Sequence, residues 1–92
     1  MSNSYFKDPS ALLEYTWDWA PWLAEVADTI SSATVTVSGG ITAVGSPVVG
    51  STAVTQRVSG GAVGTPCAMV CQITTVGGLI DERTINLTIS ER

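Results

Sequence analysis

The sequence predicts an all-β protein folded as an antiparallel β-sandwich of about seven short strands, and three observations carry this prediction. From residue 29 onward the chain is rich in valine, isoleucine, threonine and serine, which suit a pleated sheet. Apolar and polar residues alternate there, and glycine clusters interrupt the alternation at intervals of roughly 8 to 14 residues. No helical crossover of about a dozen residues fits after Ser31, which disfavours parallel strands.

The first residues are expected to form a short helical or extended arm. Asp8 followed by Pro9 is typical of a helix start, with Asp8 as N-cap and Pro9 at the first helical position. We therefore expect an arm over residues 1–12, ordered only with a partner, and a sandwich over residues 13–92.

An aromatic-rich stretch opens the sandwich. Alternating apolar residues predict a strand and then, after Pro21, the apolar spacing changes to that of a short helical turn ending near Asp28. The strand positions are Leu13, Tyr15, Trp17 and Trp19, and the helical positions are Trp19, Trp22, Leu23 and Val26.

The later strands follow from alternation alone. The clearest covers residues 84–90, with one apolar face that we expect to be buried and one polar face. Further strands are predicted at 33–37, 51–59 and 65–75, with weaker pieces at 41–44 and 46–50. The expected inward residues are Ala33, Val35, Val37, Val54, Val58, Cys67, Met69, Cys71, Ile73, Ile85, Leu87 and Ile89. Pro47 places its piece at a sheet edge or a strand start.

Charge narrows the possible partners. The net charge is -4 and the chain has four cations, which argues against nucleic acid, since phosphate neutralisation supplies most of that affinity. Residues 29–80 contain one charged residue, Arg57. Such a surface is either covered by neighbours in an assembly or kept soluble by its threonines and serines, and the sequence leaves both readings open.

The residues offer little for catalysis, a metal or a cofactor, and we expect none of these. Histidine is absent, and Cys67 and Cys71 on one strand would lie about 13 Å apart, too far for a disulfide. Two cysteines cannot complete a zinc site alone, so both are expected to be reduced core residues. The adjacent Asp81 and Glu82 are interpreted as a solvated hairpin end.

The opening residues contain no apolar run long enough for a signal peptide, and no stretch is long enough for a membrane span. We therefore expect the chain to remain in the cytoplasm where it is made. Trp19 and Trp22 either close the core or meet a partner. With Tyr5 and Phe6 they form the candidate interface residues.

Several motifs, in this order, resemble one family. They are "KDPSALLEYTWDWAPWL", "DTISSATVTV", "SGGAVGT" and "DERTINLTI". This ordered set, from Lys7 to Ile89, is similar to the small phage proteins that act as fibre-to-tail adaptors. The positions that match are Tyr15, Asp18, Trp19, Trp22, Leu23, Asp28, Ile30, Gly60, Gly61, Gly64, Asp81, Glu82 and Arg83.

The resemblance implies an immunoglobulin-like β-sandwich in a phage virion, assembled in the host cytoplasm, that joins the tail or neck to tail fibres or tailspikes. It implies other virion proteins as partners, including tail or neck ring and portal-proximal proteins. We also expect a ring of identical subunits and no contact with membrane. The alternatives are a carbohydrate-binding module that stacks sugars on exposed tryptophans, and a domain that decorates the capsid.

Overall fold

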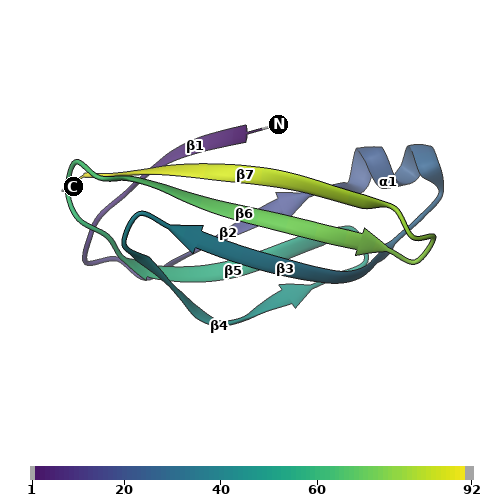
Figure 1. The fold of residues 1–92 in the computed structure, drawn as a ribbon, viewed down its shortest axis with the longest axis horizontal. Helices are drawn as coiled ribbons and strands as arrows, with labels where there is room; N and C mark the ends of the chain where they lie inside the picture. Colours follow the sequence, from purple (N-terminus) through teal and green to yellow (C-terminus); the bar gives the residue numbers. More distant parts are fainter. Residues whose placement is uncertain (1, 91–92) are drawn as a thin grey trace.

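The computed structural model describes residues 2–90, which form two β-sheets facing each other across a core (Figure 1). The elements are β1 (Ser2–Lys7), β2 (Leu13–Asp18), α1 (Ala20–Val26), β3 (Ile30–Ser38), β4 (Ile41–Val49), β5 (Ala53–Gly60), β6 (Pro66–Thr75) and β7 (Ile80–Ile89). One sheet has the order β1-β7-β6-β3 and the other has the order β2-β5-β4. The predicted sandwich of seven strands is confirmed.

The N-terminal strand departs from the predicted antiparallel pattern. β1 runs parallel to β7, with Tyr5 opposite Leu87 and Lys7 opposite Ile89, whereas the other pairings within residues 2–90 are antiparallel. Parallel pairing is possible here because the whole sandwich separates the two strands in the chain. That residues 1–12 are ordered only with a partner stays a prediction.

The predicted helix start at Asp8 is wrong. The Asp8 carboxylate accepts a hydrogen bond from the Ser10 N–H at 2.7 Å, and its carbonyl accepts one from the Ala11 N–H at 3.1 Å. This is a single turn, after which β2 begins at Leu13. Asp and Pro favour turns as strongly as helix starts, and pairing of β2 with β5 stabilises the extended chain beyond.

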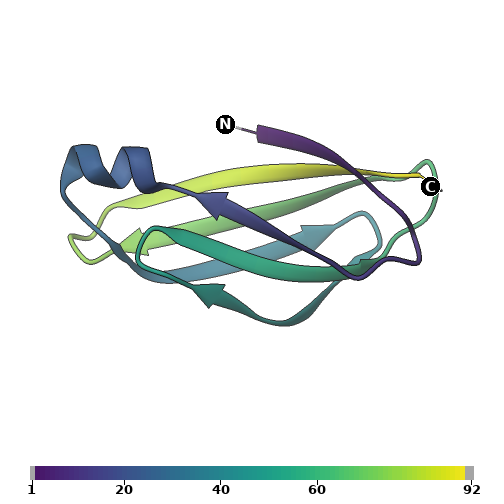
Figure 2. The same cartoon turned by 180° about the vertical axis from the view of Figure 1, so that it is seen from behind.

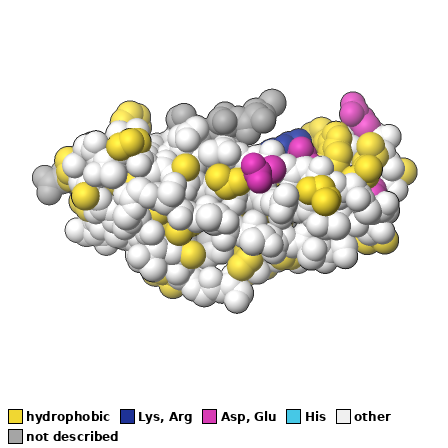
Figure 3. Space-filling model, viewed as in Figure 1, with side chains coloured by type: hydrophobic (Ala, Val, Ile, Leu, Met, Phe, Trp, Pro, Cys, Tyr) yellow, Lys and Arg dark blue, Asp and Glu magenta, His cyan; other side chains and the backbone are white. Residues whose placement is uncertain are grey.

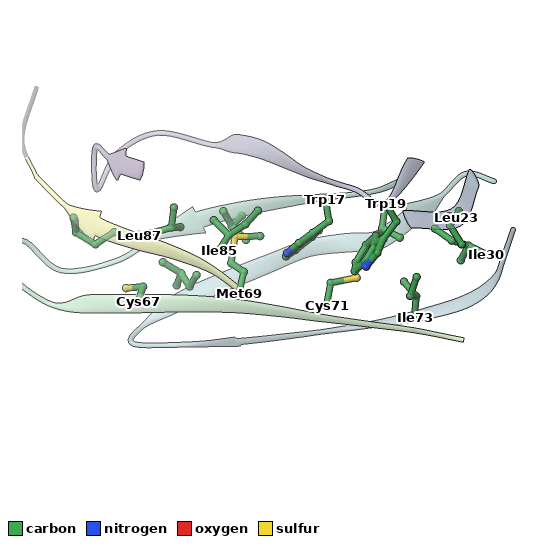
Figure 4. Packing of buried hydrophobic residues seen from close by; sticks show 14 residues of the cluster. Trp17, Trp19, Leu23, Ile30, Cys67, Met69, Cys71, Ile73, Ile85 and Leu87 are labelled. Carbon is green, nitrogen blue, oxygen red and sulfur yellow. The ribbon is translucent and has the colours of Figure 1, made fainter. Parts of the chain in front are cut away.

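The core lies between the sheets and follows the alternation of the strands. In Figure 4 the labelled side chains form a continuous row from Leu87 to Leu23. The expected inward faces are confirmed for β6, β7 and β5, and those of β3 are partly buried against the core. The buried apolar residues are Trp17, Trp19, Leu23, Ile30, Ile41, Val54, Val58, Cys67, Met69, Cys71, Ile73, Ile85, Leu87 and Ile89.

The two weak pieces predicted around Pro47 form one edge strand, β4, interrupted by a register shift between Val44 and Val48. The buried Gln56 of β5 supports this irregularity, because its side-chain amide donates hydrogen bonds to the carbonyls of Val44 at 3.3 Å and Gly45 at 3.2 Å. A buried amide that is satisfied in this way holds the bulged strand against the sheet.

The molecule is elongated, with principal extents of 42 × 23 × 17 Å. α1 and the turn between β6 and β7 lie together at one end, and β7 finishes at the other end (Figures 1 and 2). The functional surfaces can therefore be described as an α1 end, an opposite end and two outer sheet faces.

Candidate interaction surface

The joint between β2 and α1 is fixed by its own polar groups. Oδ1 of Asp18 accepts a hydrogen bond from the Ala20 N–H at 2.9 Å, and Pro21 occupies the first turn of the helix. Ala27 ends the helix in the left-handed conformation, with φ 50°, while the Asp28 N–H donates to the Leu23 carbonyl at 3.0 Å. The predicted strand leading into a helical turn is confirmed.

Trp19 is the centre of a network that connects this joint to β7. Its indole Nε1–H donates a hydrogen bond of 2.8 Å to Oδ2 of Asp81. The Arg83 guanidinium lies 5.1 Å from the centroid of the Trp19 ring, and its Nε is 3.5 Å from the same Asp81 oxygen. Arg83 also donates to the Asp18 carbonyl at 2.8 Å. Asp18, Asp81 and Arg83, which all match the family pattern, thus stabilise the fold.

The interpretation of Asp81 and Glu82 as a hairpin end is therefore wrong. β7 already begins at Ile80, so both residues lie in a strand and point to opposite faces. Asp81 points inward to Trp19, and Glu82 is exposed. A sequence reading without pairing partners cannot tell where a turn ends and the strand begins.

Asp28 holds the end of α1 to the turn between β6 and β7. Its carboxylate accepts hydrogen bonds from the backbone N–H of Thr29 at 2.8 Å and of Gly77 at 3.2 Å. Hydrogen bonding from the Thr75 side chain, followed by that from the Thr29 backbone, lowers the pKa of Asp28 below its ordinary value. Asp28 therefore carries its negative charge at neutral pH.

The interface candidates occupy different environments. Trp19 is 0% exposed, and Trp22 packs half-buried against the core, so the two tryptophans close the domain's own core at the α1 end. Tyr5 and Phe6 are 44% and 64% exposed on β1. Tyr5 reaches across to the other sheet, with its ring 5.2 Å from that of Tyr15 between centroids.

Phe6 belongs to a broad surface that we call the outer face. It is the side of the four-stranded sheet that points away from the core. Its described residues include Phe6, Thr34, Thr36, Ala68, Val70, Gln72, Glu82, Thr84, Asn86 and Thr88. Among the described side chains of this face, Glu82 alone carries a charge.

Three buried polar residues, Lys7, Gln56 and Thr75, were missed by the sequence reading. Lys7 is 0% exposed, and its Nζ donates hydrogen bonds to the carbonyls of Gly60 at 2.8 Å and Asp8 at 2.9 Å. Gln56 is buried behind β4. Lys7 lies two residues after Tyr5, so the two side chains share one face of the strand, and this could have predicted its inward position. A single lysine near a terminus, however, is normally expected to be exposed to solvent.

The glycine motif at 59–65 contributes to the same region. Gly60, Gly61 and Gly64 have positive φ values, as turns require. A Cβ on Gly61 would lie 2.6 Å from a carbon of Ile89, so this position must also be small. The motif is thus structural, since it allows the chain to pass over the end of β7.

The two thiols within residues 2–90 belong to the core. Cys67 and Cys71 are free and buried, and burial raises the pKa of the Cys71 thiol to about 12, which keeps it protonated and unreactive. No group of three or more potential metal ligands occurs in this range. Within residues 2–90, no helix has the length and apolarity that a membrane span requires.

Comparison with known proteins identifies the family. A family model described as "Podophage GP4 fiber-tail adaptor protein gp77" matches residues 7–88. A search of curated proteins gave no match. The matched range includes Lys7 and the glycine turn, which one hydrogen bond joins. It also includes the β2–α1 joint and the Asp81–Arg83 segment, which two further hydrogen bonds join. The chain therefore belongs to the podophage fibre-to-tail adaptor family and is a structural component of the phage tail.

Proposed function

We propose that this adaptor assembles as a ring of identical subunits at the tail or neck and there joins portal-proximal proteins to a tail fibre or tailspike. The observation that carries the proposal is the outer face, which has exposed Phe6 and, among its described residues, the single charge of Glu82. In a ring, such a face can pack against a different face of the next subunit with little desolvation of charge.

Within this proposal Phe6 is the main interface residue, and Tyr5 and Trp22 are secondary ones because their side chains are only partly accessible. The Trp19 side chain has no exposed surface, so any part it plays is to hold the α1 end in shape. We also propose assembly in the host cytoplasm and a role that involves no catalysis.

The carbohydrate-binding alternative loses its basis. It required exposed tryptophans as stacking platforms, whereas Trp17 and Trp19 are buried and Trp22 is half-buried. The buried tryptophans instead supply the bulk of a core that is otherwise made of small and medium side chains.

Negative-stain microscopy of virions that lack the gene tests the adaptor role. We expect particles with a tail that carries few or no fibres, and normal fibres on such particles would contradict the proposal. Native mass spectrometry of the purified chain tests the ring. A Phe6→Asp variant is expected to be monomeric, whereas Val48→Asp, which adds the same charge to exposed β4, should assemble like the wild type.

A further inference from the structure

Within residues 2–90, four strands lie at the edge of a sheet and have a paired neighbour on one side alone. They are β1 and β3 in the four-stranded sheet and β2 and β4 in the three-stranded sheet. An open edge exposes backbone N–H and C=O groups that can pair with a strand of another molecule, and proteins usually protect such edges with charges, prolines or bulges. The four edges of this sandwich differ in whether they carry this protection.

Both edges of the three-stranded sheet are protected. β2 carries the exposed carboxylates of Glu14 and Asp18, which place negative charge along its edge. β4 contains Pro47, which has no N–H to donate, and Gly45, whose φ is 74°. The register of β4 also shifts around these two residues. A further strand would therefore meet charge on β2 and an irregular backbone on β4.

The edge of β3 has none of these protections. Its nine residues, Ile30–Ser38, include neither a charged residue nor a proline, and Figure 3 shows the surface over β3 without a charged side chain. The loop before β5 covers the start of the strand, because the Ile30 N–H donates to the Ser51 carbonyl at 2.9 Å. From Ser32 to Ser38 the register with β6 is continuous, so this part forms a regular open edge.

The edge of β1 resembles that of β3. Ser2–Lys7 has no proline, and its one charged group is withdrawn, since Lys7 is buried and binds the carbonyls of Gly60 and Asp8. β1 is parallel to β7, while β7 and β3 are each antiparallel to β6, so β1 and β3 run in the same direction. One subunit therefore presents two different open edges on opposite sides of the same sheet.

The inward residues at these two edges are incompletely covered. Val35 points toward the core from β3 but is only partly buried, whereas Cys71, its partner on β6, is fully buried. Tyr5 points inward from β1 and is 44% exposed, whereas its partner on β7, Leu87, is 1% exposed. A further strand at each edge would remove this apolar surface from water.

A second copy of this chain fits both edges at once. In a ring, each subunit contacts the next through two different surfaces, and β3 of one subunit with β1 of the next is such a pair. This contact places Val35 and Tyr5 on the inner side of the joined strands. It places Phe6 next to the outward threonines of β3 on the other side. Neither strand brings an exposed charge to the contact, so no charge is desolvated.

We propose that the ring is held together by strand addition, in which β3 of one subunit pairs in parallel with β1 of the next. The two strands run in the same direction within a subunit, and a rotation that reverses a strand is a half-turn, which closes at two subunits. The four-stranded sheets then form one continuous sheet around the ring. This inference rests on the proposed ring and identifies the surface of the next subunit that Phe6 meets.

Hydrogen exchange followed by mass spectrometry tests the pairing directly. In the wild-type ring, the edge-facing amides of both β1 and β3 should exchange at least tenfold more slowly than in a dissociated subunit. Phe6→Asp supplies the dissociated subunit for β3, and Thr36→Lys supplies it for β1, so each strand is compared at an unchanged sequence. β4 is the internal control and should exchange at the same rate in all three proteins. Slower exchange in β3 alone, or in neither strand, overturns the inference.

Native mass spectrometry of edge variants provides the second arm. Thr36→Lys places a cation at the open edge of β3 and should be monomeric, whereas Thr42→Lys, the same change on β4, should form the wild-type ring. Both threonines are exposed, so urea denaturation should give both variants the midpoint of the wild type. A wild-type chain that stays monomeric overturns the proposed ring itself. A ring that persists in Thr36→Lys overturns this inference alone.

Discussion

At the scale of single residues, the buried tryptophans differ in whether the indole N–H has a hydrogen-bond acceptor. Trp17 and Trp19 both bury an indole, but Nε1 of Trp19 donates to Asp81, whereas the buried Nε1 of Trp17 has no hydrogen-bond partner among the described residues. The difference arises because β7 places the Asp81 carboxylate beside the indole of Trp19. Asp81 is therefore the residue whose loss should be felt most at the α1 end.

Asp81→Ala is expected to lower the free energy of unfolding by about 1–3 kcal/mol, because the buried Trp19 N–H loses its acceptor. Urea denaturation followed by tryptophan fluorescence measures it. Glu82→Ala, the exposed neighbour, should change the stability by less than about 0.5 kcal/mol. Equal effects of the two changes would mean that the Trp19 hydrogen bond is unimportant.

The Cys71 thiol should resist alkylation in the folded protein. Its pKa is raised from 9.0 to about 12, so it remains protonated at alkaline pH values where the unfolded chain is ionised. Its contribution to stability is fully present below pH 9.0 and is lost as the pH rises toward 12. In a Cys67→Ala background, iodoacetamide at about pH 9 should modify the protein only after urea is added. Rapid modification of the native protein would contradict its burial.

At the scale of elements, sequence patterns predicted which segments form strands and which of their faces are buried. They did not predict the turns and contacts at the ends of those segments. β6 and β7 were predictable because apolar residues occupy every second position, and burial on one face requires nothing else. The Asp8 turn was not, since the same residues suit a helix start. The Trp19–Asp81 contact was also out of reach, because it depends on the positioning of β7 beside a joint 62 residues earlier in the chain.

Substitutions in β7 test the predicted faces of a strand. Ile85→Ala or Leu87→Ala should each lower the free energy of unfolding by about 2–5 kcal/mol, since both side chains are fully buried. Thr88→Ala, at an exposed position of the same strand, is the control, with an expected change below about 0.5 kcal/mol. Chemical denaturation gives all three values, and a Leu87 effect as small as that of Thr88 would reject the assignment of faces.

Asp28 should make the junction between α1 and the β6–β7 turn sensitive to acid. Its pKa is lowered in the folded state, first by the Thr75 side chain, so its contribution is present above the ordinary value of 3.8 and is lost as the pH falls through the lowered pKa. Asp28→Asn is therefore expected to be less stable than the wild type at neutral pH, with a difference that shrinks in acid. Thermal unfolding as a function of pH measures this.

At the scale of the whole molecule, the order of the strands in the two sheets could not be predicted from the sequence. Alternation of apolar and polar residues shows which face of a strand is buried, but it does not show which strands are neighbours. Nothing in the first residues indicated that β1 would pair with β7 in parallel. Lys7 explains part of the outcome. Its ammonium group binds the Gly60 carbonyl, and its own carbonyl accepts the Ser90 N–H at 2.9 Å. The first strand is thereby connected to both the turn after β5 and the end of β7.

Lys7→Met should therefore weaken the whole sandwich. Hydrogen bonds made by a buried charged group are each worth about 1.5–3 kcal/mol, and the free energy of unfolding should fall by at least this amount. Arg57→Met removes the same charge from an exposed ion pair and should cost at most about 1 kcal/mol. Urea denaturation compares them, with hydrogen exchange of the β1 and β7 amides as a second measurement. Unchanged exchange in Lys7→Met would show that the lysine does not hold β1.

The scarcity and placement of cations also determine how the folded chain meets a digestive protease. Trypsin cuts after lysine and arginine, and the three such residues within the described range, Lys7, Arg57 and Arg83, all lie inside paired strands. A protease needs an extended, unpaired segment in its active site, so each cut must wait until a strand opens. The rate of tryptic digestion therefore reports how often the sandwich opens, with almost no contribution from surface loops.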